Sequence, residues 1–201
     1  MITFLLIRHG DTMAGNTVPG RKPGVHLSSN GLKQAAQIAE LLKDVPIKHI
    51  CCSPLDRTLE TAGPISESHG LVLEINPGLL EIDFGDWTGK SFQELESIYE
   101  WKLFHIFRSG TRIPNGEMMI EIQQRMVTEI EKLRERFKSG IIAVVSHGDP
   151  IKTLIAHYAG IPLDYVLRVR IDTASVSVIK IDDFGAELRC LNFSDHLPPL
   201  E

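Results

Sequence analysis

Cationic and imidazole side chains follow three apolar runs of the sequence, and they are the residues best suited to carry chemistry. Arg8 and His9 end the first run, Arg57 follows the second, and His147 ends the third. Guanidinium groups bind phosphate oxygens through paired hydrogen bonds, and a histidine can serve as a covalent nucleophile. Phosphoryl transfer depends mainly on positioning and on neutralising charge. These residue types therefore favour a site for a compact multivalent anion such as a phosphoryl group.

The same runs define the elements that must position these side chains. Residues 2–7, 47–52 and 141–145 predict buried strands. Helical segments separate them, which indicates a three-layer α/β fold: a doubly wound, mostly parallel sheet with helices on both faces. Parallel strands end at one edge of a sheet, where ligands bind. The other predicted elements are a strand at 71–75, helices at 91–107 and 117–137, a C-terminal antiparallel hairpin of residues 174–181 and 186–192 at one edge of the sheet, and a tail at 195–201.

Two predicted helices begin close to the candidate site residues. Ser53 is expected to cap the helix that carries Arg57 in its first turn. Asp149 is expected to cap the helix that runs through His157. An arginine has the wrong charge for a helix N-terminus unless an anion binds there. An earlier helix is expected to bury its apolar positions Leu32, Ala35, Ala36, Ala39 and Leu42.

Length and composition indicate one globular domain over residues 1–201, with 43% hydrophobic and 23% charged residues. The net charge of −5 argues against a nucleic-acid-binding surface. Cys51, Cys52 and Cys190 lack metal-ligand spacing and are expected to be buried thiols of a reducing compartment. The apolar run at 2–7 is too short for a signal peptide or a membrane span. We therefore expect a cytoplasmic protein whose partner is a small molecule, with no nucleic acid and no membrane. The composition does not indicate whether the protein is a monomer or an oligomer.

Several short blocks follow one another along the chain in a recognisable order. They are Arg8-His9-Gly10-Asp11-Thr12 with Asn16; Leu27-Ser28 with Gly31 and Gln34-Ala35; Ser53-Pro54-Leu55 with Arg57-Thr58 and Thr61-Ala62; Leu80-Glu81 with Gly85, Trp87 and Gly89; and Val145-Ser146-His147-Gly148. In this order they resemble the histidine phosphatase superfamily, in its phosphoglycerate mutase-like branch, over roughly residues 4–160. The resemblance implies the phosphoglycerate mutase-like fold. The loop at 19–26 is richer in Pro and Gly than the usual mutase loop and is similar to small bacterial phosphatase-like members.

The resemblance also implies roles for the matching residues. His9 would be the nucleophile that becomes phosphohistidine, and Glu81 would be the general acid for the leaving oxygen and then the base for water. The chemistry it implies needs no metal and no cofactor. Arg8, Arg57 and His147 would count with His9 and Glu81 as catalytic. The residues it implies for binding the phosphoryl group are Arg8, Asn16, Arg57, His147 and Gly148.

Four functional readings fit this sequence. The first is a metal-independent phosphomonoesterase acting on a small phosphorylated metabolite. The second is a phosphoglycerate mutase, which in the family has a longer chain and extra cap segments. The third is a non-catalytic phospho-ligand binder, which usually lacks the nucleophile or the acid. The fourth is a metallohydrolase that would use His9, Asp11, His147 and Asp149, although Arg8 and Arg57 would repel a divalent cation.

Specificity is expected to reside in the segments 11–30 and 92–117, because the catalytic residues would contact only the phosphoryl group and its bridging oxygen. In the first segment, Arg21 and His26 either contact the rest of the substrate or lie on the loop surface. Asp83 and Asp86 are expected to be solvated or to cap turns. The sequence does not identify the substrate.

Overall fold

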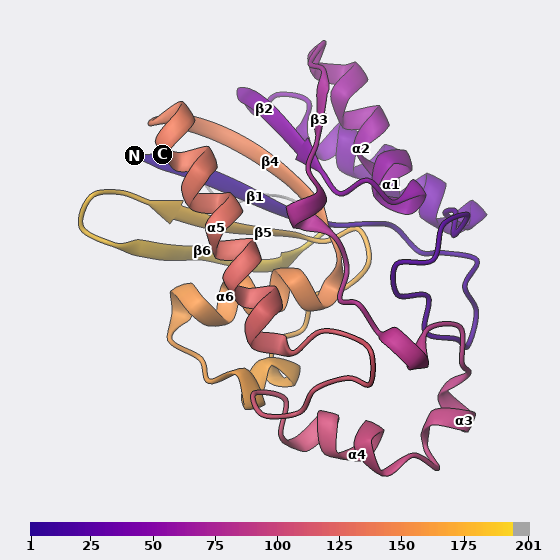
Figure 1. The fold of residues 1–201 in the computed structure, drawn as a ribbon. Coiled ribbons are helices and arrows are strands. Elements are labelled where there is room, and N and C mark those ends of the chain that lie inside the picture. The colour runs from indigo at the N-terminus through magenta and orange to yellow at the C-terminus, as the bar shows by residue number, and fades with distance from the viewer. Residues whose placement is uncertain (195–201) are drawn as a thin grey trace.

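A six-stranded sheet forms the centre of the molecule, and the computed structural model describes residues 1–194 of the chain. The strands lie in the order β3-β2-β4-β1-β5-β6 (Figure 1). The first four of that order run parallel, whereas β5 is antiparallel to both β1 and β6. The mostly parallel sheet with an antiparallel hairpin at one edge is thus confirmed; the predicted tail at 195–201 lies outside the described residues. The strands are β1 (Ile2–Arg8), β2 (Ile47–Cys52), β3 (Leu73–Ile75), β4 (Gly140–Ser146), β5 (Val176–Ile181) and β6 (Ala186–Phe193).

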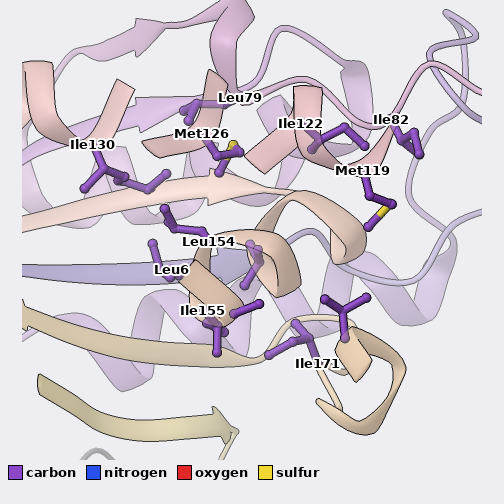
Figure 2. Packing of buried hydrophobic residues seen from close by; sticks show 14 of the residues in the cluster. Leu6, Leu79, Ile82, Met119, Ile122, Met126, Ile130, Leu154, Ile155 and Ile171 are labelled. Carbon is purple, nitrogen blue, oxygen red and sulfur yellow. The ribbon is translucent and has the colours of Figure 1, made fainter. Parts of the chain in front are cut away.

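Helices cover both faces of this sheet, which confirms the three-layer prediction. Successive residues of a strand point to opposite faces. Phe4 and Leu6 of β1 therefore join one apolar cluster, and Leu5 and Ile7 join the other. Figure 2 shows part of the first cluster, where side chains of two helices meet those of the sheet. The helices on that face are α5 (Met119–Phe137) and α6 (Gly148–Ala159), and those on the opposite face are α1 (Ser29–Leu42) and α2 (Asp56–His69) (Figure 1).

The buried face of α1 differs from the predicted one. Leu32 is 54% exposed and Ala36 is also exposed, so two of the five expected core positions were wrong. Ile38 is buried in their place. The buried face includes Gly31, which lies against the backbone of Gly10 and Asp11, and the sequence spacing does not reveal that close approach. The buried residues of α1 are Gly31, Ala35, Ile38, Ala39 and Leu42.

Two helix starts also differ from the predicted ones, and each expected capping residue binds a residue distant in the chain instead. Helix α2 begins at Asp56, and the Ser53 hydroxyl lies 2.8 Å from Nε2 of His147 instead of capping the helix. Helix α6 begins at Gly148, so Asp149 lies in its first turn and not at its cap. Arg57 still lies in the first turn of α2, as predicted.

The segment predicted as one helix at 91–107 contains two short helices beyond the carboxyl edge of the sheet. They are α3 (Phe92–Leu95) and α4 (Tyr99–Ile106), and extended backbone at Ile98 separates them (Figure 1). Ser91 and Glu94 form a capping box that starts the first of them. Short 3-10 turns lie at η1 (Pro77–Leu79), η2 (Gly85–Trp87) and η3 (Leu163–Arg168). Within residues 1–194, no helix combines the length and the apolarity that crossing a bilayer requires.

Candidate active site

His9 lies directly after β1, at the carboxyl edge of the sheet. Its backbone amide donates a hydrogen bond to the carbonyl of Ser146, which brings the ends of β1 and β4 together. Its Nδ1 lies 2.7 Å from the carbonyl oxygen of Gly10. A carbonyl oxygen only accepts hydrogen bonds, so Nδ1 carries the proton and Nε2 keeps its lone pair. The second ring nitrogen of His9 can therefore act as a nucleophile.

The surroundings keep the His9 imidazole neutral. Burial and the charge of Arg57, together with that of Arg8, lower its pKa to about 3, although the hydrogen bond to Gly10 opposes the shift. Removing an imidazolium from water is costly, and neighbouring guanidinium groups repel it. At neutral pH the side chain is unprotonated at Nε2 without the help of a separate base.

His147 lies beside His9, with 5.1 Å between the ring centroids. Its Nε2 lies 2.8 Å from the Ser53 hydroxyl, and its Nδ1 is buried without a hydrogen-bond partner. Burial, followed by the nearby His9 and Arg57, holds the pKa of His147 well below its usual range. A neutral His147 has one N–H, and the hydroxyl of Ser53 can donate to Nε2 when that proton is on Nδ1.

Two guanidinium groups complete the cationic side of the site. Arg8 donates from one terminal nitrogen to the carbonyl of Ile171 at 2.7 Å, and its Nε has no partner. Arg57 is 1% exposed and donates to the carbonyl of Gly20 at 2.7 Å, while its Nε and its other terminal nitrogen have no partner. Burial lowers the pKa of Arg57.

Unpartnered buried nitrogens are concentrated at this site. Among the described residues, six buried side-chain polar atoms lack a hydrogen-bond partner, and four of them belong to Arg8, Arg57 and His147. A buried donor without a partner usually costs about 1–3 kcal/mol. Such a concentration of donors is therefore typical of a site that binds an anion, which would accept these hydrogen bonds.

Glu81 lies opposite the imidazoles, in the irregular segment between η1 and η2. A carboxylate oxygen of Glu81 and ring nitrogens of His9 and His147 lie within 4.8 Å of one another. Withdrawal from water and the negative charge of Asp149 raise the pKa of Glu81 to about 7, against the opposing charge of Arg57. A carboxyl group with this pKa can exist in either protonation state near neutral pH, so it can donate a proton and take one back.

Close backbone packing holds the loop that follows His9. A side chain at Gly31 would meet the carbonyl oxygen of Asp11 at 2.0 Å, so only glycine fits there. The amide of Gly10 donates to the Thr61 hydroxyl at 3.0 Å, and the amide of Asp11 donates to Gln34 at 2.8 Å. Sequence reasoning included Gly31, Gln34 and Thr61 in the matched blocks but gave them no role; they hold the backbone directly after His9.

The remaining predicted binding residues lie at different distances from this centre. A side chain at Gly148 would contact the Arg8 guanidinium at 3.4 Å, so Gly148 lies directly against the cationic side. Asn16 is exposed in the loop, and its backbone carbonyl accepts a hydrogen bond from the amide of Phe92 at 3.2 Å. A role for its side chain stays a prediction.

The metal set that the sequence suggested is not brought together. The carboxylate of Asp11 accepts a hydrogen bond from Ser28 at 2.6 Å, and that of Asp149 forms an ion pair with Arg108 at 3.3 Å. Burial alone would raise the pKa of Asp149, but the charges of Arg108, Lys152 and Arg8 and the hydrogen bond from Arg108 together outweigh it and hold the pKa below its ordinary value. His9, Glu81 and His147 could present ligand atoms to a metal ion, but Arg8 and Arg57 flank them and would repel a dication.

Arg21 and His26 have partners within the protein. Arg21 donates from Nε to the carbonyl of Glu81 at 2.8 Å and forms an ion pair with Glu117 at 2.8 Å. His26 forms an ion pair with Glu60 at 2.5 Å, and this hydrogen bond raises the pKa of His26. Residues of the loop after β1, His26 among them, line a hollow of about 280 Å³.

The prediction that Asp83 and Asp86 are solvated or cap turns is confirmed, because Asp83 caps a turn and Asp86 is exposed. Asp83 accepts a hydrogen bond from the amide of Gly85 at 3.0 Å, and Asp86 accepts one from Asn115 at 3.1 Å. Of the cysteines, Cys51 and Cys52 are buried, and burial raises the pKa of each thiol to about 12. Cys190 is only partly buried.

Comparisons with known proteins agree with this geometry. The family model for the histidine phosphatase superfamily (branch 1) matches residues 4–194. The chain is 30% identical over 183 residues to the probable phosphoglycerate mutase GpmB of Erwinia tasmaniensis. The matched region covers 88% of this chain and 84% of that protein.

Solved structures extend the likeness to phosphatases. An alpha-ribazole phosphatase from Shigella flexneri has a TM-score of 0.87 at 30% identity, covering 98% of this chain and 99% of that one. A variant phosphoserine phosphatase from Entamoeba histolytica, solved with phosphoserine, has a TM-score of 0.87 at 26% identity, covering 98% of this chain and 100% of that one. The relatives thus include proteins named for phosphoryl transfer and proteins named for phosphate release.

Proposed function

We propose that this chain, which belongs to the histidine phosphatase superfamily (branch 1), is a metal-independent phosphomonoester hydrolase that acts through a phosphohistidine at His9. The observation that carries the proposal is the hydrogen bond between Nδ1 of His9 and the Gly10 carbonyl, which leaves Nε2 free in a site where buried nitrogens of Arg8, Arg57 and His147 have no partner in the protein. A phosphoryl group would accept hydrogen bonds from those donors while its phosphorus atom is attacked. The cations would be Arg8 and Arg57, and His147 would donate from Nδ1.

In the first step of the proposed mechanism, Nε2 of His9 forms a bond to phosphorus and the bond from phosphorus to the ester oxygen breaks. The electron pair of that bond goes to the leaving oxygen, which takes a proton from the Glu81 carboxyl group. The products of the step are the free alcohol, phosphohistidine and a Glu81 carboxylate. Arg8 and Arg57 neutralise the charge on the non-bridging oxygens.

In the second step, the Glu81 carboxylate takes a proton from a water molecule whose oxygen attacks phosphorus. The bond between phosphorus and His9 breaks, and its electron pair returns to Nε2. Inorganic phosphate leaves, and both side chains return to their starting protonation states. One carboxyl group can serve both steps because its pKa of about 7 lets it exchange a proton near neutral pH.

We infer a small phosphorylated metabolite in the cytoplasm as the substrate, with no nucleic acid or membrane involved. The second candidate is a mutase, which the likeness to the Erwinia protein favours. A mutase protects its phosphoenzyme from water so that the phosphoryl group returns to a substrate. A panel of phosphorylated metabolites, assayed in parallel for inorganic phosphate and for isomerised product, distinguishes the two activities.

The test of the proposal is to trap the phosphoenzyme. Wild-type protein mixed with labelled substrate and quenched rapidly should carry an acid-labile, alkali-stable phosphoryl group. His9→Ala should carry none and should not turn over, while chelators leave the wild-type rate unchanged. A label that persists in His9→Ala would refute the assignment, as would activity that chelators abolish and added metal restores.

A further inference from the structure

Glu81 lies in a segment that has little regular structure to hold it. The segment is flanked by the single turns η1 and η2, and the carboxylate accepts a hydrogen bond from the next backbone amide, that of Ile82, at 3.0 Å. A general acid must lie within hydrogen-bond reach of the leaving oxygen. The position of the Glu81 carboxyl group therefore depends on what fixes the backbone of residues 78–83.

Two guanidinium groups converge on the backbone carbonyl oxygen of Glu81. Arg125, from α5, donates to this oxygen at 3.1 Å, and Arg21, from the loop after β1, donates to it at 2.8 Å. Arg125 also donates to the carbonyl of Gly78 at 2.9 Å, so it spans the segment from its start to the acid. Hydrogen bonds from charged donors are among the stronger ones in proteins.

Glu117 joins these two arginines into one cluster. Its carboxylate lies 2.8 Å from Arg21 and 3.2 Å from Nε of Arg125. It also accepts a hydrogen bond from the amide of Asp83 at 3.0 Å, and its own amide donates to the Asp83 carbonyl at 3.0 Å. The backbone is thus held on both sides of Glu81.

Apolar contacts hold the same segment against the same helix. Leu79 and Ile82 are fully buried and belong to the cluster that includes the α5 residues Met126 and Ile122 (Figure 2). These contacts keep the segment on α5, whereas the charged hydrogen bonds fix the peptide of Glu81 itself. Arg125 is close enough to the imidazoles that its charge contributes to the lowered pKa of His147.

We propose that Arg125 and Arg21 are positioning residues that aim the Glu81 carboxyl group at the leaving oxygen by holding its peptide carbonyl. This inference rests on the proposed function, in which Glu81 is the general acid. His9, Arg8 and Arg57 are held by contacts that do not involve Arg125, so loss of the Arg125 side chain should slow proton transfer and spare phosphoryl binding. Arg21 lies in the loop after β1, so its hydrogen bond joins Glu81 to that loop. The carbonyl of the preceding residue, Gly20, accepts a hydrogen bond from Arg57.

The test compares Arg125→Met with Arg134→Met, a matched control on the same helix. Arg134 also donates to a backbone carbonyl, that of Asp182 at 3.0 Å, and also pairs with a glutamate, Glu131, at 2.9 Å, but this end of α5 is remote from the site. Phosphoenzyme formation is measured in single turnover with an alkyl phosphate and with p-nitrophenyl phosphate, whose leaving group needs little protonation.

For Arg125→Met we expect about 10²-fold slower phosphoenzyme formation from the alkyl phosphate, the scale of loss that follows a misplacement of about 1 Å. The rate with p-nitrophenyl phosphate should change much less, and vanadate should bind as tightly as to wild type. Amide exchange at residues 80–83 should be faster than in wild type. Arg134→Met should leave both rates and this exchange unchanged, and Arg125→Lys, which keeps one charged donor, should recover part of the loss.

Glu81→Gln separates failure of this inference from failure of the proposed function. If Glu81→Gln slows the alkyl phosphate selectively and Arg125→Met slows both substrates equally or neither, the positioning role is refuted. If Glu81→Gln itself shows no selectivity, the proposed acid is wrong. Should Arg125→Met fail to fold, Arg21→Met applies the same test, because Arg21 has a side chain 30% exposed and lies in a loop; equal slowing of both substrates there refutes the inference as well.

Discussion

At the scale of single residues, the site separates two kinds of titrating group that an enzyme of this type needs. His9 has a pKa lowered to about 3, so its Nε2 carries no proton at any physiological pH, as the proposed nucleophile requires. Glu81 has a pKa raised to about 7, so it can hold a proton until the leaving oxygen needs it. Burial moves both pKa values, but in opposite directions, because it disfavours a cation in one case and an anion in the other.

The raised pKa of Glu81 predicts the pH dependence of catalysis. Only the protonated acid assists the first step, so kcat/KM for an alkyl phosphate should fall as the pH rises through about 7. Glu81→Gln should lower kcat/KM by about 10²–10⁴-fold and should remove this alkaline limb, because a glutamine does not titrate. The measurement is a pH profile of kcat/KM for both proteins. An alkaline limb at the same pH in Glu81→Gln would mean that another group is the acid.

At the scale of elements, the position of His9, the proposed nucleophile, depends on how α1 begins. The loop after β1 returns to the start of α1, where the backbone of Gly31 touches both Gly10 and Asp11. A side chain at Gly10 would lie 2.7 Å from the carbonyl oxygen of Gly31, so neither of these two positions accepts a larger residue without movement. Helix α1 is thus both a cover for the sheet and a support for the backbone beside His9.

Gly31→Ala should therefore lower stability and activity together. The new methyl group meets a backbone oxygen that cannot move alone, and such overpacking typically costs about 1–3 kcal/mol of the free energy of unfolding. Because Asp11 and Gly10 would shift with it, kcat should also fall. The measurements are urea unfolding and steady-state kinetics on the same samples.

The control is Ala36→Gly, on the exposed face of the same helix. It should cost about 0.5–1 kcal/mol through helix propensity alone and leave kcat unchanged. Equal effects of the two variants on kcat would show that general weakening of α1, and not the close approach at Gly31, governs the activity.

At the scale of the whole molecule, the sheet brings cations to one edge of a chain whose net charge is −5. The unpartnered nitrogens of Arg8, Arg57 and His147 lower the stability of the free protein, because each is buried without a partner. An anion that accepts their hydrogen bonds should stabilise the folded state by mass action. The donors that would bind an anion therefore lower the stability of the protein as long as no anion is bound.

Vanadate, which mimics the trigonal bipyramidal phosphoryl group, should accordingly raise Tm. At 100 times its Kd the gain is about 2.7 kcal/mol, which corresponds to roughly 5–11 °C for a chain of this size. Arg57→Met should lose most of this shift at the same concentration, since charged hydrogen bonds are worth about 1.5–3 kcal/mol each. Differential scanning calorimetry makes the comparison.

Arg112→Met is the control, because Arg112 is a 55% exposed arginine paired with Glu121 at the start of α5. It should keep the whole vanadate shift. A wild-type shift retained in Arg57→Met would show that vanadate binds elsewhere, and the cationic site would then be wrong.

The sequence by itself determined the architecture and the gathering of Arg8, His9, Arg57 and His147. Apolar runs that alternate with amphipathic segments admit few arrangements, and a parallel sheet places all strand ends at one edge. The residue order of the matched blocks added Glu81, which no periodicity would have indicated. These features are local or topological, so they can be read without knowing which side chains touch.

Only the tertiary structure decided what each neighbouring residue does. Ser53 binds His147 instead of capping its helix. From the sequence, Arg21 could either contact the substrate or lie on the loop surface; in the structure it donates a hydrogen bond to the peptide carbonyl of Glu81. Arg125 had no signal in the sequence beyond being a charged position in a helix, and the pKa values of His9 and Glu81 depend on burial and on charges from several elements. Each of these depends on distances between residues far apart in the chain, which a pattern along the sequence does not contain.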